Sequence, residues 1–274
     1  MRFGCCTPAV NHATFLSTST LDYIEENVQS FLVPLQSGDV FAANLDQALV
    51  CGKPILAANC FLPGNLPCVG PAVDLPSILA YAEVAFHRAA QTGIQRIVFG
   101  SGGSRRIPDG FAVARAREQF TSLLIRLAPM AARNSLQVVV EPLNPGECNF
   151  ITCVRDGAAI VREVAHPAIR LLADLYHMAR ADETADDLAA VVDLVTHVHI
   201  AEKAERTAPG VAGDDFRKFF QVLQAANYDQ GISLECGRFD LKTELESGLT
   251  AVRTQWLSAA PEGQYQRRSR SLSA

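Results

Sequence analysis

The sequence predicts a single (β/α)₈ barrel, in which a ring of parallel strands is surrounded by helices. Short runs of apolar and β-branched residues alternate with longer amphipathic stretches along nearly the whole chain, which is typical of repeated strand–helix units. The length of 274 residues and the hydrophobic content of 49% suit one barrel with a large core. We expect residues 1–258 to form this barrel and residues 259–274, which are polar and basic, to be a disordered tail.

Eight segments have the composition of barrel strands. Each is four to six residues long and consists mainly of apolar or β-branched residues. The expected strands are Arg2–Thr7, Leu21–Glu26, Pro54–Asn59, Arg96–Phe99, Gln137–Glu141, Arg170–Leu175, His197–Ala201 and Ile232–Cys236.

Apolar residues recur at three- and four-residue spacing between these strands, which predicts helices that pack one face on the sheet. Gly93, Asn134 and Asn227 lie where helix C-caps are expected. Only about a dozen residues separate the first two strands, so the first helix is expected to be short. The other expected helices are Leu75–Ala90, Asp109–Ala132, Val154–Val164, Asp187–Leu194, Asp214–Ala226 and Leu241–Leu257.

Charge and cysteine content narrow the class of protein. A net charge of −5 gives no basic field for a phosphate backbone, which argues against a nucleic-acid partner. The chain has no secretion-signal pattern and no stretch near the roughly 20 apolar residues of a membrane span, so we expect a cytoplasmic protein with no membrane partner. The eight cysteines form no C-x-x-C pair and are expected to be reduced and buried. The oligomeric state, including a homo-oligomer, stays open.

Four of the expected strands end in a side chain that can bind a metal ion. These residues are Glu141, Asp174, His199 and Glu235, on the fifth to eighth strands. Reactive groups of a parallel barrel lie at the C-terminal ends of its strands, so the four side chains should meet at one mouth. Three carboxylates there would repel one another unless a cation neutralised them. The pattern predicts one divalent metal ion, with Mn²⁺ or Mg²⁺ favoured and Co²⁺ or Zn²⁺ also compatible.

Short motifs surround these four residues in a distinctive order. They are VVVEPLNPGECNF, LLADLYHM, VHIAE followed by APGVAGDDF, and ISLECGR. Together they resemble the xylose isomerase-like barrel superfamily, and within it the sugar isomerase and epimerase branch that includes ketose 3-epimerases and hydroxypyruvate isomerases. The likeness covers about residues 2–257. It implies that the four residues are metal ligands and that Glu141 and Glu235 also exchange protons with the substrate.

The same resemblance implies three residues that bind the substrate. Glu147 matches a glutamate at the substrate's hydroxyl end, His177 a histidine that bonds a substrate oxygen, and Arg206 a substrate-binding arginine. Counted from His199, Arg206 lies one residue beyond the usual place, which indicates an insertion in this loop. Glu202 stands where relatives often carry Asp.

These residues predict a metal-dependent isomerase or epimerase that acts on a small sugar. Moving a proton on an α-hydroxy ketone through an enediolate needs an acidified C–H and, for inversion, a base and an acid on opposite faces. Glu141 and Glu235 are the expected pair. One alternative is a metal-dependent dehydratase of a hydroxy-keto acid, similar to 3-dehydroshikimate dehydratases. Another is a sugar-binding barrel without catalysis, while an apurinic-site endonuclease would need more histidines.

Three other polar features have more than one interpretation. His197 shares a strand face with the predicted metal-binding histidine, so it should point into the barrel at a deeper level. The glycine-rich run that ends in Arg105 and Arg106 fits either a tight turn or an anion site. Of Glu25 and Glu26, which end the second strand, one should face the interior and reach the substrate, and the other should face outward.

Overall fold

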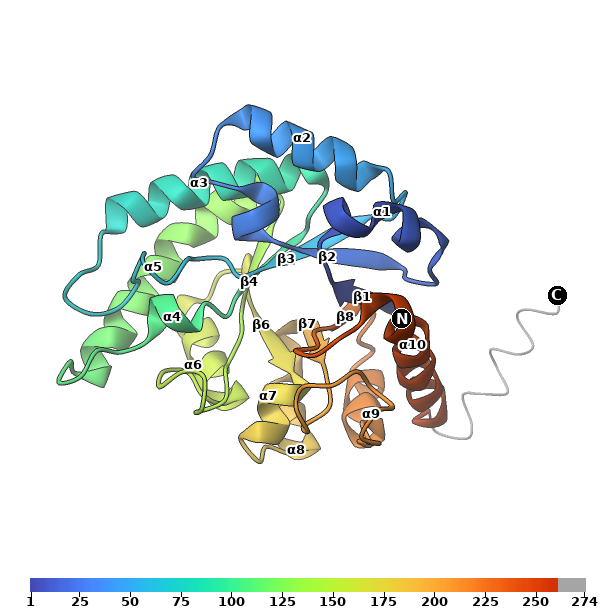
Figure 1. Ribbon diagram of the computed structural model, residues 1–274. Coiled ribbons are helices and arrows are strands. Elements are labelled where there is room, and N and C mark those ends of the chain that lie inside the picture. The colour runs from blue at the N-terminus through green and yellow to red at the C-terminus, as the bar shows by residue number, and fades with distance from the viewer. Residues whose placement is uncertain (261–274) are drawn as a thin grey trace.

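The strands form a closed ring. In the computed structural model, which describes residues 1–260, each strand runs parallel to its neighbours, and β1 (Arg2–Cys6) pairs with β8 (Gly231–Leu234) (Figure 1). Strand order around the ring follows the order along the chain, so all carboxyl ends lie at one mouth. The (β/α)₈ prediction is confirmed. The predicted disordered tail lies, from residue 261 onward, outside the described residues.

All the predicted strands form, with ends no more than two residues from those expected. Their residues are mostly buried, as expected for a parallel sheet that helices cover. The remaining strands are β2 (Tyr23–Asn27), β3 (Ile55–Asn59), β4 (Arg96–Phe99), β5 (Gln137–Val140), β6 (Ile169–Asp174) and β7 (Val195–Ile200).

Helices surround the ring. Five of the six predicted helices form, but the segment predicted as one helix over Asp187–Leu194 is a short helix followed by a 3₁₀ turn. Within the described residues, no helix is long and apolar enough to cross a membrane. The helices are α1 (Ala9–Thr18), α2 (Gly38–Leu49), α3 (Leu75–Thr92), α4 (Gly102–Arg105), α5 (Val113–Arg133), α6 (Val154–Val164), α7 (Leu175–Arg180), α8 (Ala185–Ala189), α9 (Arg217–Ala225), α10 (Leu241–Ser258), the π-helix η1 (Val28–Leu32) and the 3₁₀ turn η2 (Val192–Leu194).

The first strand–helix units differ from the prediction of a short first helix. Helix α1 has ten residues, and the Glu26 carboxylate accepts the backbone N–H of Ala9 at 2.6 Å, which satisfies a free donor at the helix start. Helix α2, which the sequence pattern did not reveal, packs against α1. Its exposed apolar side chains, among them Val40 and Leu49, blur the amphipathic pattern.

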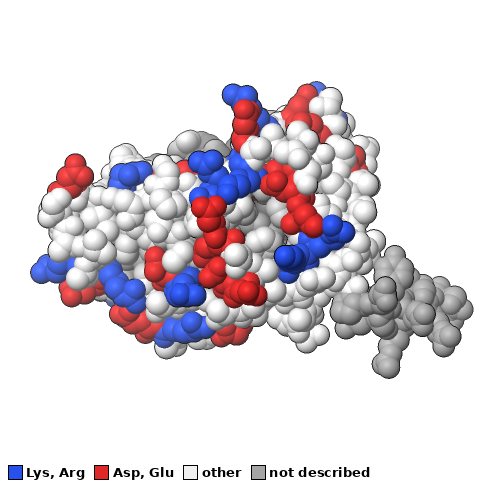
Figure 2. All heavy atoms as spheres, turned by 90° about the horizontal axis from the view of Figure 1, so that it is seen from below, with Lys and Arg blue, Asp and Glu red and all other residues white. Residues whose placement is uncertain are grey.

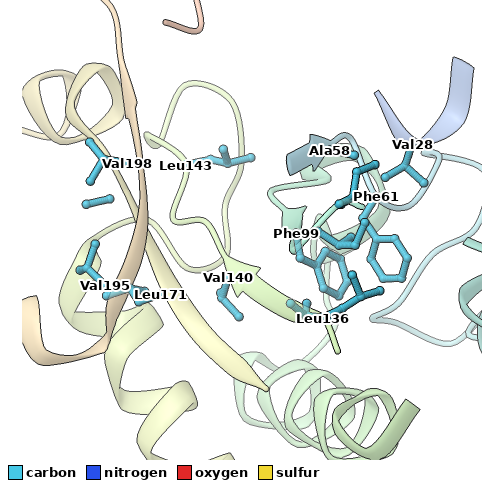
Figure 3. Packing of buried hydrophobic residues seen from close by; sticks show 14 of the residues in the cluster. Val28, Ala58, Phe61, Phe99, Leu136, Val140, Leu143, Leu171, Val195 and Val198 are labelled. Carbon is cyan, nitrogen blue, oxygen red and sulfur yellow. The ribbon is translucent and has the colours of Figure 1, made fainter. Parts of the chain in front are cut away.

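Most of the core lies between the strands and the surrounding helices. The rings of Phe61 and Phe99 meet edge-on at 5.1 Å, and Phe86 of α3 stacks on Phe61 at 5.5 Å. Figure 3 shows Phe61 and Phe99 side by side in this layer. Phe120 of α5 packs on Phe99 at 5.1 Å. Burying each ring stabilises the fold by roughly 1.5–3 kcal/mol and fixes α3 and α5 against β3 and β4.

The interior of the barrel has two sectors of different chemistry. Val98, Val139 and Leu172, from β4, β5 and β6, form a small buried cluster that we call the apolar sector. Residues next to them in sequence belong to the outer core, so these three side chains point inward. On β2, β7 and β8 the buried inward residues carry polar groups and form the polar sector: Tyr23, Glu25, His197 and Ser233.

Candidate metal centre

The structure brings the four predicted metal ligands together at the mouth of the barrel. Glu141 follows β5, Asp174 ends β6, His199 lies in β7 and Glu235 follows β8. One ligand atom from each residue lies within 4.8 Å of the others. Three of the side chains are buried and Glu235 is partly exposed. Asp174 pairs with His199 across β6 and β7, and Glu235 follows the β8 residue that pairs with Ile200, which explains why residues distant in sequence meet here.

His199 lies between two groups of carboxylates. Its Nδ1 is 3.1 Å from Glu141 Oε1 and 3.2 Å from Glu235 Oε2, and its Nε2 is 2.9 Å from Glu25 Oε1. Burial lowers the pKa of His199, but the charges of Glu25 and Glu235 outweigh it, so the pKa lies well above its ordinary value. A metal ion bound through Nδ1 would therefore have to displace a proton from this ring.

The two glutamates of the cluster have different environments. Burial raises the pKa of Glu141, and the charge of Glu235 raises it further. Burial also acts on Glu235, but His199 and Arg206 outweigh it and lower the pKa of Glu235 to about 2. A side chain at Gly100 would overlap the Glu141 carboxylate, so glycine at this strand end leaves room for that carboxylate in its present position. The pair thus combines a readily protonated and a readily ionised carboxyl group.

Arg206 lies against the cluster although its loop carries the inferred insertion. Its guanidinium contacts the Glu235 carboxylate and lies 3.1 Å from Asp174 Oδ2, and its Nε donates to the Glu235 carbonyl oxygen at 3.0 Å. It also lies over the ring of Tyr176, 4.7 Å from the centroid. The structure therefore places the Arg206 guanidinium beside two carboxylates of the cluster.

His177 and Glu147 lie beside the cluster. The amide of Asn144 donates to His177 Nδ1 at 2.8 Å, so the His177 proton is on Nε2, which is 3.4 Å from Asp174 Oδ2. Glu147 is 42% exposed and lies 3.9 Å from both His177 and Arg206. The three predicted substrate-binding residues thus line one side of the same mouth, with two donors and one acceptor.

Glu202 organises the loop that carries Arg206. Its buried carboxylate accepts the backbone N–H groups of Gly210 at 2.7 Å and Gly213 at 3.0 Å, together with those of Ala212 and Asp214. Burial raises the pKa of Glu202, but these donors outweigh it and lower the pKa. Glu202 therefore anchors the backbone of residues 210–214 in this loop.

Two further polar residues of the site were not predicted. Asn59, at the end of β3, donates to Glu235 Oε1 at 2.9 Å, and Asn144 fixes His177 as described above. Asn59 carries the same signal as the four ligands, because it is a polar residue that closes an apolar strand. Asn144 lies in a loop, where no periodic pattern points to its direction.

The glycine-rich run after β4 forms the short helix α4, and its arginines bind the chain itself. Arg105 is fully buried and donates to the carbonyl oxygens of Phe99 at 3.0 Å and Ile151 at 3.5 Å. Arg106 donates to the carbonyl oxygen of Glu147 at 2.7 Å. The interpretation as a turn is therefore supported over the anion site, and the two arginines hold the loop that follows β5.

Cysteines and surface charge agree in part with the sequence analysis. All eight cysteines are free, as expected, but only four are buried and Cys60 is exposed. Acidic and basic side chains are interspersed on the face drawn in Figure 2, without a broad basic patch. This distribution matches the net charge of −5.

Comparison with known proteins gives partial sequence relatives. A 3-dehydro-D-guloside 4-epimerase of Escherichia coli K12 is 34% identical over 123 residues, which cover 44% of this chain and 46% of the epimerase. An L-ribulose 3-epimerase of Methylomonas sp. DH-1 is 29% identical over 149 residues, which cover 54% of this chain and 52% of that protein. The chain thus spans about half the length of the curated relatives it matches.

Structural similarity extends over nearly the whole barrel. The apo crystal structure of a 3-keto-D-glucoside 4-epimerase from E. coli has a TM-score of 0.77, covers 93% of this chain and 99% of its own, and is 22% identical. At this identity the similarity shows a shared fold. The family model described as xylose isomerase-like TIM barrel matches residues 21–257, which include every residue of the cluster. The chain therefore belongs to the xylose isomerase-like TIM barrel family.

Proposed function

We propose that this protein is a divalent-metal-dependent isomerase or epimerase of sugars, which moves a proton on the carbon next to a carbonyl group. The observation that carries the proposal is the cluster of Glu141, Asp174, His199 and Glu235, whose ligand atoms lie within 4.8 Å of one another. Enzymes with this barrel have their active sites at this mouth. The names of the two partial relatives, both sugar epimerases, support the same class of reaction.

The chemistry of the cluster fits a divalent metal ion. Three carboxyl groups and one imidazole offer oxygen and nitrogen ligands to a fairly hard cation, which favours Mn²⁺ or Mg²⁺ and allows Co²⁺ or Zn²⁺. A cation would also balance negative charge that is largely buried. When bound, the ion would polarise a substrate carbonyl and make the adjacent C–H more acidic.

Glu141 and Glu235 are our candidates for proton transfer. They extend from β5 and β8, and their carboxylate oxygens lie 3.1 Å and 3.2 Å from His199 Nδ1. The low pKa of Glu235, about 2, keeps this group in the ionised form that can accept a proton, while the raised pKa of Glu141 favours the protonated form that can donate one. Epimerisation would use both residues, because the proton leaves one face of the carbon and returns to the other.

Arg206, His177 and Glu147 are our candidates for binding the sugar. The Arg206 guanidinium and the Nε2–H of His177 can donate to substrate oxygens, and Glu147 can accept from a hydroxyl group. Charge-assisted hydrogen bonds of this kind suit a small, highly hydroxylated molecule. The three residues would hold the sugar while the glutamates exchange its proton.

Solvent deuterium incorporation tests the proposal. Metal-stripped protein would receive Mn²⁺ and a panel of ketoses, hydroxypyruvate and 3-dehydroshikimate, with a metal-free sample as control. We expect metal-dependent exchange at the carbon next to the carbonyl, together with an isomeric product. Loss of water from the substrate would point to the dehydratase, and tight Mn²⁺ binding without any exchange would favour a sugar-binding barrel.

A further inference from the structure

Glu25 is a buried carboxylate whose two oxygens are both hydrogen-bonded. Its Oε1 lies 2.9 Å from His199 Nε2, and its Oε2 lies 2.7 Å from His197 Nε2 and 2.6 Å from the Ser233 hydroxyl. The Tyr23 hydroxyl is 2.8 Å from Ser233 Oγ and continues the network. Glu25 is 1% exposed, so these side chains replace water as its partners.

The network defines where the histidine protons are. The Ser233 hydroxyl donates to Glu25 Oε2, and each Glu25 oxygen lies within hydrogen-bond distance of a histidine Nε2, so the carboxylate acts as the acceptor in every contact. Both Nε2 atoms must therefore carry a proton. His197 Nδ1 is buried and has no hydrogen-bond partner among the described residues, as expected for the unprotonated nitrogen of a neutral ring.

The same geometry decides which nitrogen of His199 is available to a metal ion. With Nε2–H bound to Glu25, the Nδ1 atom faces the oxygens of Glu141 and Glu235. A histidine that binds a metal commonly donates its other N–H to a carboxylate, which fixes the ring and makes the ligand nitrogen more basic. Glu25 has the position and the charge for this task.

We propose that Glu25 is a positioning residue of the metal centre, which holds the His199 ring with Nδ1 directed at the cluster. The inference rests on the proposed function, because it presumes that the four-residue cluster binds a metal ion. Glu25 acts through His199 and not by touching the substrate. This role replaces the expectation that the inward glutamate of β2 reaches the substrate.

The fold is built to keep this network in place. Tyr23 fills the interior next to Gly4 of β1 and Gly231 of β8, and a side chain on either glycine would overlap the Tyr23 ring. Its hydroxyl orients Ser233, which in turn donates to Glu25. The glycines at these two positions of β1 and β8 thus leave room for Tyr23, whose hydroxyl belongs to the polar network beneath the proposed metal ligands.

A competing arrangement shares His199. Cys6, Glu25 and His199 also lie within 4.8 Å of one another through their ligand atoms. Glu25 already accepts three hydrogen bonds, so using it as a ligand would leave buried donors without partners. The geometry therefore favours the four-residue cluster as the metal site, with Glu25 as the hydrogen-bond partner of the proposed ligand His199.

Metal binding to the wild type and four variants tests the role of Glu25. Mn²⁺ affinity would be measured by calorimetry, and the Co²⁺ absorption spectrum would be recorded, for the wild type and for Glu25→Gln, Glu25→Ala, Glu26→Gln and Tyr23→Phe. Glu26→Gln is the matched control, because the neighbouring glutamate faces outward to α1. Tyr23→Phe loosens the same network without removing the His199 partner. Thermal unfolding of the metal-free proteins would show that each variant folds.

We expect Glu25→Gln to weaken Mn²⁺ binding about tenfold or more and to shift the Co²⁺ bands, with the controls near the wild type. Glu25→Ala, which removes the acceptor altogether, should lose about 100-fold. Equal affinity in wild type and Glu25→Gln would overturn the inference and leave the proposed function standing, as would an equal loss in Tyr23→Phe. A thiolate-to-cobalt band in the near ultraviolet would instead place the ion at Cys6. Absence of metal binding by the wild type would contradict the proposed function itself.

Discussion

The apolar and polar sectors of the barrel interior carry different parts of the candidate centre. Val139 and Leu172 lie two residues before Glu141 and Asp174 on the same strand faces, so these carboxylates stand above apolar side chains. On the other side, His197 and Ser233 lie two residues before His199 and Glu235. Glu141 and Asp174 therefore lie above packed apolar side chains, whereas His199 and Glu235 lie above a hydrogen-bonded network.

The two sectors therefore differ in which substitutions they tolerate. Packing in the apolar sector depends on volume and shape, so a related side chain of similar size can replace another at modest cost. In the polar sector every buried donor needs an acceptor, so a change of one group affects its partners as well. We expect substitutions in the apolar sector to change stability and the removal of the Glu25 carboxylate from the polar sector to change metal binding.

The largest effect should follow from removing a proton-transfer group above either sector. Glu141→Gln and Glu235→Gln should each lower the deuterium exchange rate by about 10²–10⁴-fold, while the fold and part of the metal affinity remain. Glu83→Gln, on the surface of α3, is the matched control and should keep full activity. Near-normal exchange in either variant would remove that glutamate from the proton-transfer role.

The apolar sector is tested by Leu172→Ala. The substitution should lower the free energy of unfolding by about 2–5 kcal/mol, because it leaves a cavity in a fully buried layer, and it should leave Mn²⁺ affinity unchanged. Denaturant unfolding and calorimetry measure the two quantities, and Leu35→Ala, at a site 75% exposed, is the control. A large loss of metal affinity with little loss of stability would break the distinction between the sectors.

Glu26→Gln sharpens the contrast between neighbouring glutamates that face in opposite directions. Burial raises the pKa of Glu26 to about 7 from its ordinary value of 4.5. Between these two pH values the folded protein binds a proton at Glu26 that the unfolded chain has released, so the stability of the fold decreases as the pH rises through this window. The variant should be more stable than the wild type by up to about 3 kcal/mol at pH 8 and equal to it at pH 4. Thermal unfolding across this range measures the difference, and a difference that does not depend on pH would contradict the prediction.

The smallest effect is expected for Arg206→Ala at the rim of the centre. KM for the sugar should rise about tenfold with a smaller change in kcat, because the guanidinium lies beside the cluster and is still 21% exposed. Arg238→Ala, in which the lost side chain is 82% exposed, is the control. An unchanged KM would show that Arg206 does not bind the substrate.

The strands and the cluster could be predicted from sequence because both depend on short-range patterns. Glu141 and Glu235 each close an apolar run, and the parallel fold brings such ends together. The direction of Glu25 could not be predicted, because the sequence of β2 places two glutamates side by side and four of its five residues are buried, so no alternation of apolar and polar residues marks the inward face.

Loop residues escaped prediction for a different reason. Arg206 and its neighbour Glu205 both have positive φ angles, so the chain reverses there in a way that no apolar period records. The spacing from His199 therefore gives the position of Arg206 in the sequence but not the direction in which its side chain points. Asn144 is similar, because its contact with His177 joins two segments 33 residues apart.

The anchoring of the loop by Glu202 bears on the thermodynamics of ligand binding. A flexible loop that closes on a sugar loses conformational entropy at that moment, which weakens the measured affinity. In this chain one carboxylate already binds the loop backbone at Gly210, Ala212, Gly213 and Asp214. This segment is therefore ordered when the chain folds, so under the proposed function a sugar would lose little affinity to the ordering of this loop.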